Sequence, residues 1–304
     1  MIRFQALLGV LGISFSAIFL RLSGVSPVTA AFFRGLYALP VLVSLWLRTR
    51  SLDTRSRASR IRAMGSGIFL ALDLVLWHQA VLDIGAGLAT VLVNAQVLFV
   101  GGLAWLLHRE RPSRRAIVLI PVVLVGVVLI SGLGRADAYG ANPVRGVILA
   151  LVAAALYAMF QLLFRESNRT LAPPTGPVLD ATIGMTVGAL VLAAPFDPRF
   201  SVAFSWPAHG WLIVMAIICQ ALAWILLGAA FPRLPALETS VMLLSQPMET
   251  VVWGWLILNE RMSVIQAAGM LVMTTGIALL LLSGTVMSRT PPNTRNTEEA
   301  LVGP

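Results

Sequence analysis

Two stretches decide the fold: residues 88–113, LATVLVNAQVLFVGGLAWLLHRERPS, and residues 238–263, ETSVMLLSQPMETVVWGWLILNERMS. A shift of 150 positions aligns residues 88–132 with residues 238–282 without a gap. The paired positions include Gln96 and Gln246, Trp105 and Trp255, Glu110-Arg111 and Glu260-Arg261, Ser113 and Ser263, and Gly126 and Gly276. Apolar matches alone would arise by chance, but polar and aromatic matches in one register predict an internal repeat.

The segments around these stretches are apolar. Of the 304 residues, 58% are hydrophobic and 12% are charged, whereas a typical soluble domain has about 25% charged residues. Apolar runs of about 20 residues cross a bilayer as helices, and lipid offers backbone groups no hydrogen-bond partners. The runs are continuous and do not alternate as barrel strands do. The composition therefore predicts an all-α integral membrane protein.

Turn residues divide the chain into ten predicted spans. Ser26-Pro27, Asn142-Pro143, Pro173-Pro174 and Trp206-Pro207 mark boundaries, because proline and its neighbours favour turns. Two prolines in Phe231–Pro235 favour ten spans over nine. The expected spans are residues 4–21, 27–47, 64–82, 86–107, 116–133, 144–164, 177–195, 208–228, 235–257 and 264–283.

The arginines predict the orientation of these spans. The chain carries a net charge of +9 and has no lysine. With the N-terminus inside, sixteen of the 22 basic residues fall in inside segments and five fall outside, while Arg34 lies within a span. This asymmetry follows the positive-inside rule and does not form the basic stripe of a nucleic-acid-binding surface. We expect both termini to be cytoplasmic and the protein to lie in a bacterial inner membrane.

The repeat predicts a particular architecture. Each copy comprises five spans, an odd number, so the two copies must insert with opposite orientations. We expect a first repeat over residues 1–134, an inverted second repeat over 135–284, and a disordered cytoplasmic tail over 285–304. Inverted repeats around a central cavity are the architecture of secondary transporters, because their halves can exchange conformations and expose one site to either side. The repeat thus favours a carrier working by alternating access.

At these residues the sequence resembles the drug/metabolite transporter superfamily, in particular its EamA-type ten-span carriers. The resemblance rests on Gly12 to Arg21 leading into Ser26-Pro27, on Ala31 to Arg34, and on the two Glu-Arg span ends, each followed by a glycine-bearing span. It extends to about residue 284. It implies export or uptake of a small metabolite without ATP hydrolysis, and amino-acid exporters of the YddG type are the nearest model.

Ionisable residues within spans mark candidate functional positions, because lipid disfavours them. The third span carries Asp73, Trp77 and His78. His78 and Trp77 are either substrate contacts or, for His78, an interhelical hydrogen bond. Asp73 and Arg34 are expected to form a buried structural ion pair; if Asp73 is unpaired, it becomes a candidate proton site.

The fourth, sixth, eighth and ninth spans carry further polar and aromatic candidates. In the ninth span, Gln246 and Glu249 share a face with Trp253. Gln246 precedes Pro247, which has no N–H and therefore leaves a carbonyl one turn earlier without its helical partner. Amides also join helices as structural contacts. The predicted substrate-binding set is His78, Trp77, Asn94, Gln96, Tyr157, Trp224, Gln246 and Glu249.

The sequence favours some functions over others. Its three histidines, His78, His108 and His209, fall on different spans, and no Walker A or G-x-S-x-G motif is present, so we expect neither an enzyme nor a metal or other cofactor. A channel would be expected to carry a repeated ring of charged residues, and the sequence shows no such ring. We expect export of amino acids, with a proton-coupled exporter of cationic or amphipathic drugs as the alternative. The expected partners are the small-molecule substrate and membrane lipids, but no nucleic acid, and the protein should be a monomer or weak dimer.

The predicted topology can be tested by labelling. A cysteine introduced at Ser56 should react only with reagent on the cytoplasmic side, and one at Ala138 only with reagent on the outer side. Membrane-impermeant maleimide applied to intact cells and to inverted vesicles measures both. Reaction of both positions from the same side would rule out the ten-span arrangement with cytoplasmic termini.

Overall fold

The computed structural model describes residues 1–84, 89, 92–108, 110–130, 142–258, 264–282 and 287–289. The first half of the chain contains α1 (Ile2–Ser14), α2 (Ser16–Ser23), α3 (Pro27–Thr49), the 3₁₀ turn η1 (Arg50–Leu52), α4 (Arg57–Ile84), α6 (Gln96–His108), β1 (Glu110–Pro112) and α7 (Arg114–Ile130). The second half contains α8 (Pro143–Glu166), α9 (Thr175–Phe196), α10 (Ala208–Met215), the π-helical segment η2 (Ala216–Leu222), α11 (Ala223–Ala230), the 3₁₀ turn η3 (Phe231–Arg233), α12 (Ala236–Leu243), α13 (Gln246–Leu258), α14 (Val264–Leu282) and β2 (Met287–Arg289).

Long apolar helices dominate the described part of the chain. By length and composition, four helical stretches could cross a membrane: Ile2–Ser23, Val28–Leu52, Val144–Glu166 and Ala208–Arg233. Shorter apolar helices cover Leu92–Leu107, Thr175–Val191 and Ala267–Leu280. α4, with 28 residues, is longer than any of these stretches and exceeds the ~20 residues that span a bilayer.

The surface of the bundle is more apolar than that of a water-soluble protein, and polar side chains are buried among the apolar ones. Large apolar side chains point outward, for example Ile117 at 59% and Val118 at 65% exposure on α7, and Val191 at 67% on α9. Polar side chains lie inside, among them Asp73, Asn94, Gln96, Gln161, Thr182, Gln220 and Ser240. Apolar patches of this extent on a surface mark contact with lipid or another apolar partner. The surface therefore fits a hydrocarbon environment.

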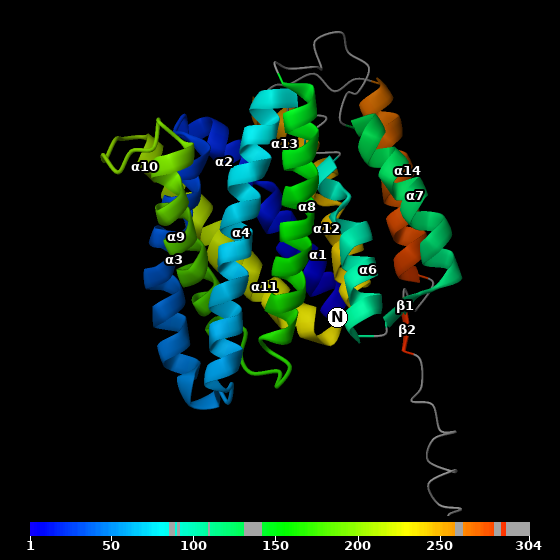
Figure 1. The fold of residues 1–304 in the computed structure, drawn as a ribbon, viewed down its shortest axis with the longest axis horizontal. Coiled ribbons are helices and arrows are strands. Elements are labelled where there is room, and N and C mark those ends of the chain that lie inside the picture. Colours follow the sequence, from blue (N-terminus) through cyan, green and yellow to red (C-terminus); the bar gives the residue numbers. More distant parts are fainter. Residues whose placement is uncertain are drawn as a thin grey trace, which may run out of the picture.

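Helices from the two halves of the chain pack against each other throughout the bundle. α7 lies beside α14 at one edge, and α3 lies beside α9 toward the opposite edge (Figure 1). Between these pairs, α4 packs on α8 and α9, α1 packs on α11, and α6 packs on α8 and α12. The core is therefore an interface between the halves, and neither half packs as a unit of its own.

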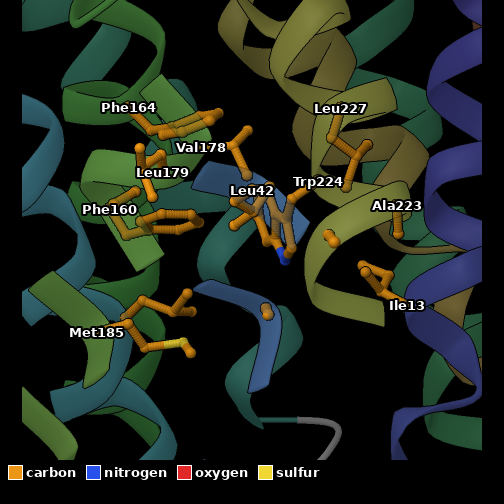
Figure 2. Packing of buried hydrophobic residues seen from close by; sticks show 14 of the residues in the cluster. Ile13, Leu42, Phe160, Phe164, Val178, Leu179, Met185, Ala223, Trp224 and Leu227 are labelled. Atoms are coloured by element: carbon orange, nitrogen blue, oxygen red, sulfur yellow. The ribbon is translucent and has the colours of Figure 1, made fainter. Parts of the chain in front are cut away.

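The largest hydrophobic cluster lies between α3, α4, α8, α9 and α11. Figure 2 shows Trp224 within it, flanked by Leu42, Val178 and Leu227. Phe160 meets the Trp224 ring edge-on with centroids 5.0 Å apart. Aromatic pairs prefer this edge-to-face arrangement. Trp224 is only 3% exposed, so it is a packing residue of the core in this conformation.

Several of the predicted spans are interrupted. The first breaks at Phe15, where the Ser14 carbonyl accepts a hydrogen bond from Thr250 Oγ1 at 3.0 Å. The ninth breaks between Leu243 and Gln246, which confirms the break expected from Pro247. A helical turn ends at Ala95, directly before α6. These interruptions place polar backbone groups inside the bundle.

The structure adds one short sheet to the predicted helices. β1 pairs antiparallel with β2, with Glu110 opposite Arg289 and Pro112 opposite Met287. β2 belongs to the segment predicted as a disordered tail, so this part of the tail is ordered. Residues 285–286 and 290–304 of that segment lie outside the described residues, as do Glu260 and Arg261 of the repeat.

Two neighbouring glycines on α4 give a matched test of helix packing. A Cβ at Gly67 would lie 1.9 Å from the Ala181 carbonyl oxygen on α9, whereas a Cβ at Gly65 would meet nothing within 4 Å. Gly67→Ala should therefore cost about 1–3 kcal/mol through overpacking. Gly65→Ala should gain about 0.5–1 kcal/mol of helix stability. Thermal unfolding in detergent measures both, and equal shifts would contradict this packing of α4 on α9.

Candidate functional site

Arg34 lies inside the bundle, where three neutral groups hold it. Its Nε donates to Gln220 Oε1 at 2.8 Å, its Nη1 to Ser16 Oγ at 2.8 Å, and its Nη2 to the Cys219 carbonyl at 3.2 Å. Gln220 in turn donates to Thr182 Oγ1 at 2.9 Å. The guanidinium is thereby fixed from α2 and from the π-helical segment η2.

The expected ion pair between Arg34 and Asp73 is not formed, so that interpretation was wrong. All hydrogen bonds that Arg34 makes in the described part of the chain go to neutral groups. Asp73 is 6% exposed, and its Oδ1 has no hydrogen-bond partner among the described residues. Groups of η2 accept hydrogen bonds from Arg34 instead, because the π-helix places Gln220 and the Cys219 carbonyl beside its guanidinium.

Tyr157 on α8 is a neighbour of both charged groups. It is half-buried on α8 and within electrostatic range of both Asp73 and Arg34. Its ring stacks on Phe160 with centroids 5.8 Å apart. Tyr157 is therefore influenced by both Asp73 on α4 and Arg34 on α3, although these two residues do not contact each other.

The break in the first span contacts the ninth span. Trp253 Nε1 donates to Ser14 Oγ at 2.8 Å, and the Trp253 ring stacks on Phe15 with centroids 4.3 Å apart. Glu249 Oε1 accepts from Ser245 Oγ at 2.9 Å, while its Oε2 has no partner among the described residues. Gln246 is half-buried on the same helix. The predicted face of Gln246, Glu249 and Trp253 thus borders the break at Phe15.

A second polar group joins the fourth, sixth and ninth spans. Gln96 Oε1 accepts hydrogen bonds from Gln161 Nε2 and, at 3.1 Å, from Ser240 Oγ. Gln96 Nε2 and Gln161 Oε1 are buried and have no partner in the described part of the chain. Gln161 lies one helical turn after Tyr157 on α8. This face of α8 therefore connects the amide group to the region around Arg34.

The remaining predicted residues are more scattered. Trp77 packs in a separate apolar cluster with Ala80, Ala89 and Ala150. Asn94 is buried at the helical turn before Ala95 and has an interaction partner. The side chain of His78 lies outside the described residues. The structure therefore places Arg34, Gln96, Gln246 and Glu249 near the helix breaks, and places Trp77 and Trp224 in apolar clusters.

Sequence analysis missed the two serines that organise this region. Ser14 and Ser16 flank Phe15 in the first span, and they contact Trp253 and Arg34 respectively. Thr182 and Thr250 were also missed. The available signal was the Ser-Phe-Ser triplet in an otherwise apolar run, since serine that bonds to the helix backbone can bend or interrupt a helix.

Ion pairs join the two halves at the ends of the bundle. Arg55 Nη2 lies 2.9 Å from Asp180 Oδ2, and Arg145 Nη2 lies 2.6 Å from Asp83 Oδ1. The hydrogen bond from Arg145 lowers the pKa of Asp83 below its usual range and outweighs the opposite effect of burial. Asp83 and Arg145 therefore remain charged partners at neutral pH.

A polar pocket of about 380 Å³ opens beside the start of α3 and α10. Ser26, Thr29, Arg199, Ser201 and His209 are among its lining residues. His209 Nδ1 is 2.5 Å from Tyr37 Oη, and its Nε2 is 3.1 Å from the Ala203 carbonyl. Both ring nitrogens of His209 are therefore occupied. Among the described residues, no group of three or more histidines, cysteines or acids gathers as metal ligands do.

Comparison with known proteins gives the class of this chain. The sequence model of the EamA-like transporter family matches residues 2–132 and again residues 144–282. The chain therefore belongs to the EamA-like transporter family, and it is a multi-pass membrane transporter of the drug/metabolite transporter superfamily. This membership points to a transporter and not to an enzyme.

Individual relatives agree with this class. "Uncharacterized transporter YcbK" of Bacillus subtilis is 23% identical over 256 residues, covering 81% of this chain and 80% of that protein. "Uncharacterized transporter sll1319" of Synechocystis is 25% identical over 273 residues, covering 88% of this chain and 79% of that protein. A crystal structure with 17% sequence identity shares the fold with a TM-score of 0.78, covering 92% of this chain and 96% of that one.

The Gln96–Gln161 contact yields a test of its structural weight. Gln96→Leu removes the acceptor of two buried donors, so it should cost about 1–3 kcal/mol of stability. Adding Gln161→Leu should recover most of that loss, because replacing both polar partners with apolar groups leaves only the Ser240 hydroxyl unsatisfied. A double-mutant cycle in thermal unfolding measures the coupling, and strictly additive losses would contradict a direct contact.

Proposed function

We propose that this transporter is a secondary carrier that exports amino acids across the bacterial inner membrane by alternating access. The observation that carries the proposal is the set of interrupted helices inside the bundle, with half-buried Gln246 and Glu249 beside them. Interrupted spans with free polar groups are where secondary transporters bind solutes. Neutral amides and a carboxylate next to Trp253 suit a small solute that has charged groups and a side chain.

Ten spans in two inverted repeats, residues 1–134 and 135–284, form part of the proposal. One support is that the family model matches the chain twice. Another is that the helical interruptions at Ala95 and Ser245 are 150 residues apart, the shift that aligned the sequence.

The packing of the helices is also symmetric under exchange of the proposed repeats. The second span packs on the seventh (α3 on α9) and the fifth on the tenth (α7 on α14). The third packs on the sixth (α4 on α8), and its counterpart, the eighth, packs on the first (α11 on α1). A two-fold relation between the halves requires these reciprocal contacts.

Two similar turns support the inversion. Asp53-Thr54-Arg55 follows the second span, and Asp197-Pro198-Arg199 follows the seventh. In each, the backbone N–H of the arginine donates to Oδ1 of the aspartate, at 3.3 Å and 3.0 Å. The α3–α4 and α9–α10 connections that contain these turns lie at opposite ends of the bundle (Figure 1).

The proposal gives the ion pairs between the halves a role. Arg55–Asp180 and Arg3–Glu238, at 2.5 Å, would hold the cytoplasmic ends together, and Asp83–Arg145 would hold the outer ends. Alternating access requires that such contacts form and break in turn. Both termini would be cytoplasmic, and the carrier would act as a monomer or weak dimer.

The second candidate is a proton-coupled exporter of cationic or amphipathic drugs. Asp73 Oδ1 and Glu249 Oε2, buried without partners among the described residues, favour it. A membrane-embedded acid can exchange a proton for a cationic solute. Flux of labelled amino acids and of labelled cations into proteoliposomes, with and without a pH gradient, separates the two candidates. Transport of cations alone would contradict amino-acid export.

The site can be tested at Gln246. Gln246→Ala should reduce amino-acid transport about ten- to hundredfold, because a hydrogen bond to a charged group contributes about 1.5–3 kcal/mol. Expression and thermal stability should stay close to those of the wild type, since Gln246 is only half-buried. Gln5→Ala, at the start of α1, is the control and should transport normally. Normal flux through Gln246→Ala would place the site elsewhere.

Glu249 gives a separate test of coupling. If Glu249 carries the coupling proton, Glu249→Gln should abolish stimulation by a pH gradient while exchange of labelled for unlabelled solute continues. Both rates can be measured in the same proteoliposomes. Unchanged gradient stimulation would assign Glu249 to helix packing through Ser245.

A further inference from the structure

The connection between α9 and α10 has a polar face and an apolar face. Residues 201–205 form neither helix nor turn. Three small side chains of the connection line the polar pocket beside the start of α3: Ser201, Ala203 and Ser205. The side chains that alternate with them are large, apolar and exposed, and we call them the apolar face: Val202, Phe204 and Trp206. This alternation is that of an extended chain, so the pocket and the apolar face adjoin each other along one short segment.

The apolar face lies at an end of the bundle. Figure 1 shows the α9–α10 connection projecting from the side of the bundle, at the end where α10 begins. Spanning helices end near the membrane surface, where aromatic side chains are enriched at the level of the lipid headgroups. Under the proposed topology this end faces outward. The exposed rings of Phe204 and Trp206 are therefore placed to contact lipid.

The pocket offers hydrogen-bond donors, while its hydroxyl oxygens already accept hydrogen bonds. Thr29 Oγ1 accepts from Ser26 Oγ at 2.9 Å and from the Ser201 backbone N–H at 3.1 Å. Ser201 Oγ accepts from the Ala203 backbone N–H at 3.2 Å. Neither the Thr29 nor the Ser201 hydroxyl donates to another group in the described part of the chain. Both hydroxyl hydrogens thus remain for a further partner, which favours an anionic ligand.

Arg199 adds a positive charge to the lining of the pocket. Its side chain is 69% exposed, and its Nε lies 3.9 Å from Asp197 Oδ1, beyond hydrogen-bonding distance. That carboxylate oxygen instead accepts from the Arg199 backbone N–H at 3.0 Å. The guanidinium therefore keeps its donors available among the described residues. Its planar fork matches the oxygens of a phosphate group.

We propose that this pocket binds the headgroup phosphate of an anionic phospholipid, whose acyl chains lie against the apolar face. Arg199 and the hydroxyl groups of Thr29 and Ser201 hold the phosphate. A lipid combines one anionic group with apolar chains, as the pocket combines donors with an adjoining apolar face. A soluble anion would leave that face uncovered. The site is separate from the break at Phe15, and it does not depend on which solute the transporter carries.

Three ligands separate the polar and apolar parts of this site. Phosphatidylglycerol has both parts, diacylglycerol has the chains without the phosphate, and sn-glycerol 3-phosphate has the phosphate without the chains. Native mass spectrometry of the purified protein in a nonionic detergent measures the binding of each. The wild type should bind phosphatidylglycerol at least about tenfold more tightly than either of the other two, because each of them lacks one set of contacts.

Two exposed side chains can be changed without altering the core. Arg199→Gln should weaken phosphatidylglycerol about tenfold or more, since a charge-assisted hydrogen bond is lost, and should leave diacylglycerol unchanged. Trp206→Ser should weaken both lipids about fivefold through lost apolar contact and leave sn-glycerol 3-phosphate unchanged. Arg199→Lys, which keeps the charge, should retain part of the affinity. Arg48→Gln removes an exposed arginine from the other end of α3; it is the matched control and should bind as the wild type does.

Four results would overturn the proposal. If Arg199→Gln binds phosphatidylglycerol as the wild type does, the guanidinium does not hold the phosphate. If Arg48→Gln weakens the lipid equally, the effect is one of surface charge in general. If sn-glycerol 3-phosphate binds as tightly as phosphatidylglycerol, the pocket is a site for a soluble phosphate. If diacylglycerol does so, the apolar face alone accounts for binding.

Discussion

The absence of water in the hydrocarbon layer is the constraint on which the structure depends. A polar group that enters the bundle is costly unless it finds a partner in the protein, because lipid cannot supply one. The backbone meets this constraint by forming helices. The side chains meet it by turning inward, so that Gln96, Gln161 and Ser240 bond to one another while valines and isoleucines face outward. Polar contacts therefore mark the interior of this protein and its interface between the halves.

Where helices are interrupted, backbone carbonyls also need hydrogen-bond partners from other helices. The Ser14 carbonyl finds Thr250, and the Cys219 carbonyl in η2 finds Arg34. Each such contact joins a residue of the first half to one of the second. Under the proposed alternating access, the two halves would rearrange around the solute. Polar contacts that can be exchanged for substrate or water contacts suit that requirement better than apolar packing, which resists rearrangement. The apolar cluster around Trp224 is packing of the second kind, which resists rearrangement.

The glycines set how closely these elements approach. Gly67 of α4 faces the Ala181 carbonyl of α9, and Gly184 of α9 faces the Met64 carbonyl of α4, each at a distance that excludes a Cβ. In membranes, small residues allow backbones to pack closely where the hydrophobic effect does not drive helices together. These two reciprocal contacts therefore fix how closely α4 and α9 approach each other.

The sequence by itself determined the membrane class, the helical fold class, the transporter family resemblance and the break before Gln246, because hydropathy and proline act locally along the chain. It also identified Arg34, Asp73, Tyr157, Gln96 and Glu249 as unusual, since charged or polar residues are rare in apolar runs. Only the tertiary structure decided their partners. Arg34 was predicted to pair with Asp73 but bonds to Ser16, Gln220 and the Cys219 carbonyl, and Trp224 was predicted to contact substrate but packs in the core. Partner choice depends on how helices rotate and where they unwind, as in η2. These features arise from packing between segments distant in the sequence, such as Gln220 and Arg34, which are 186 residues apart.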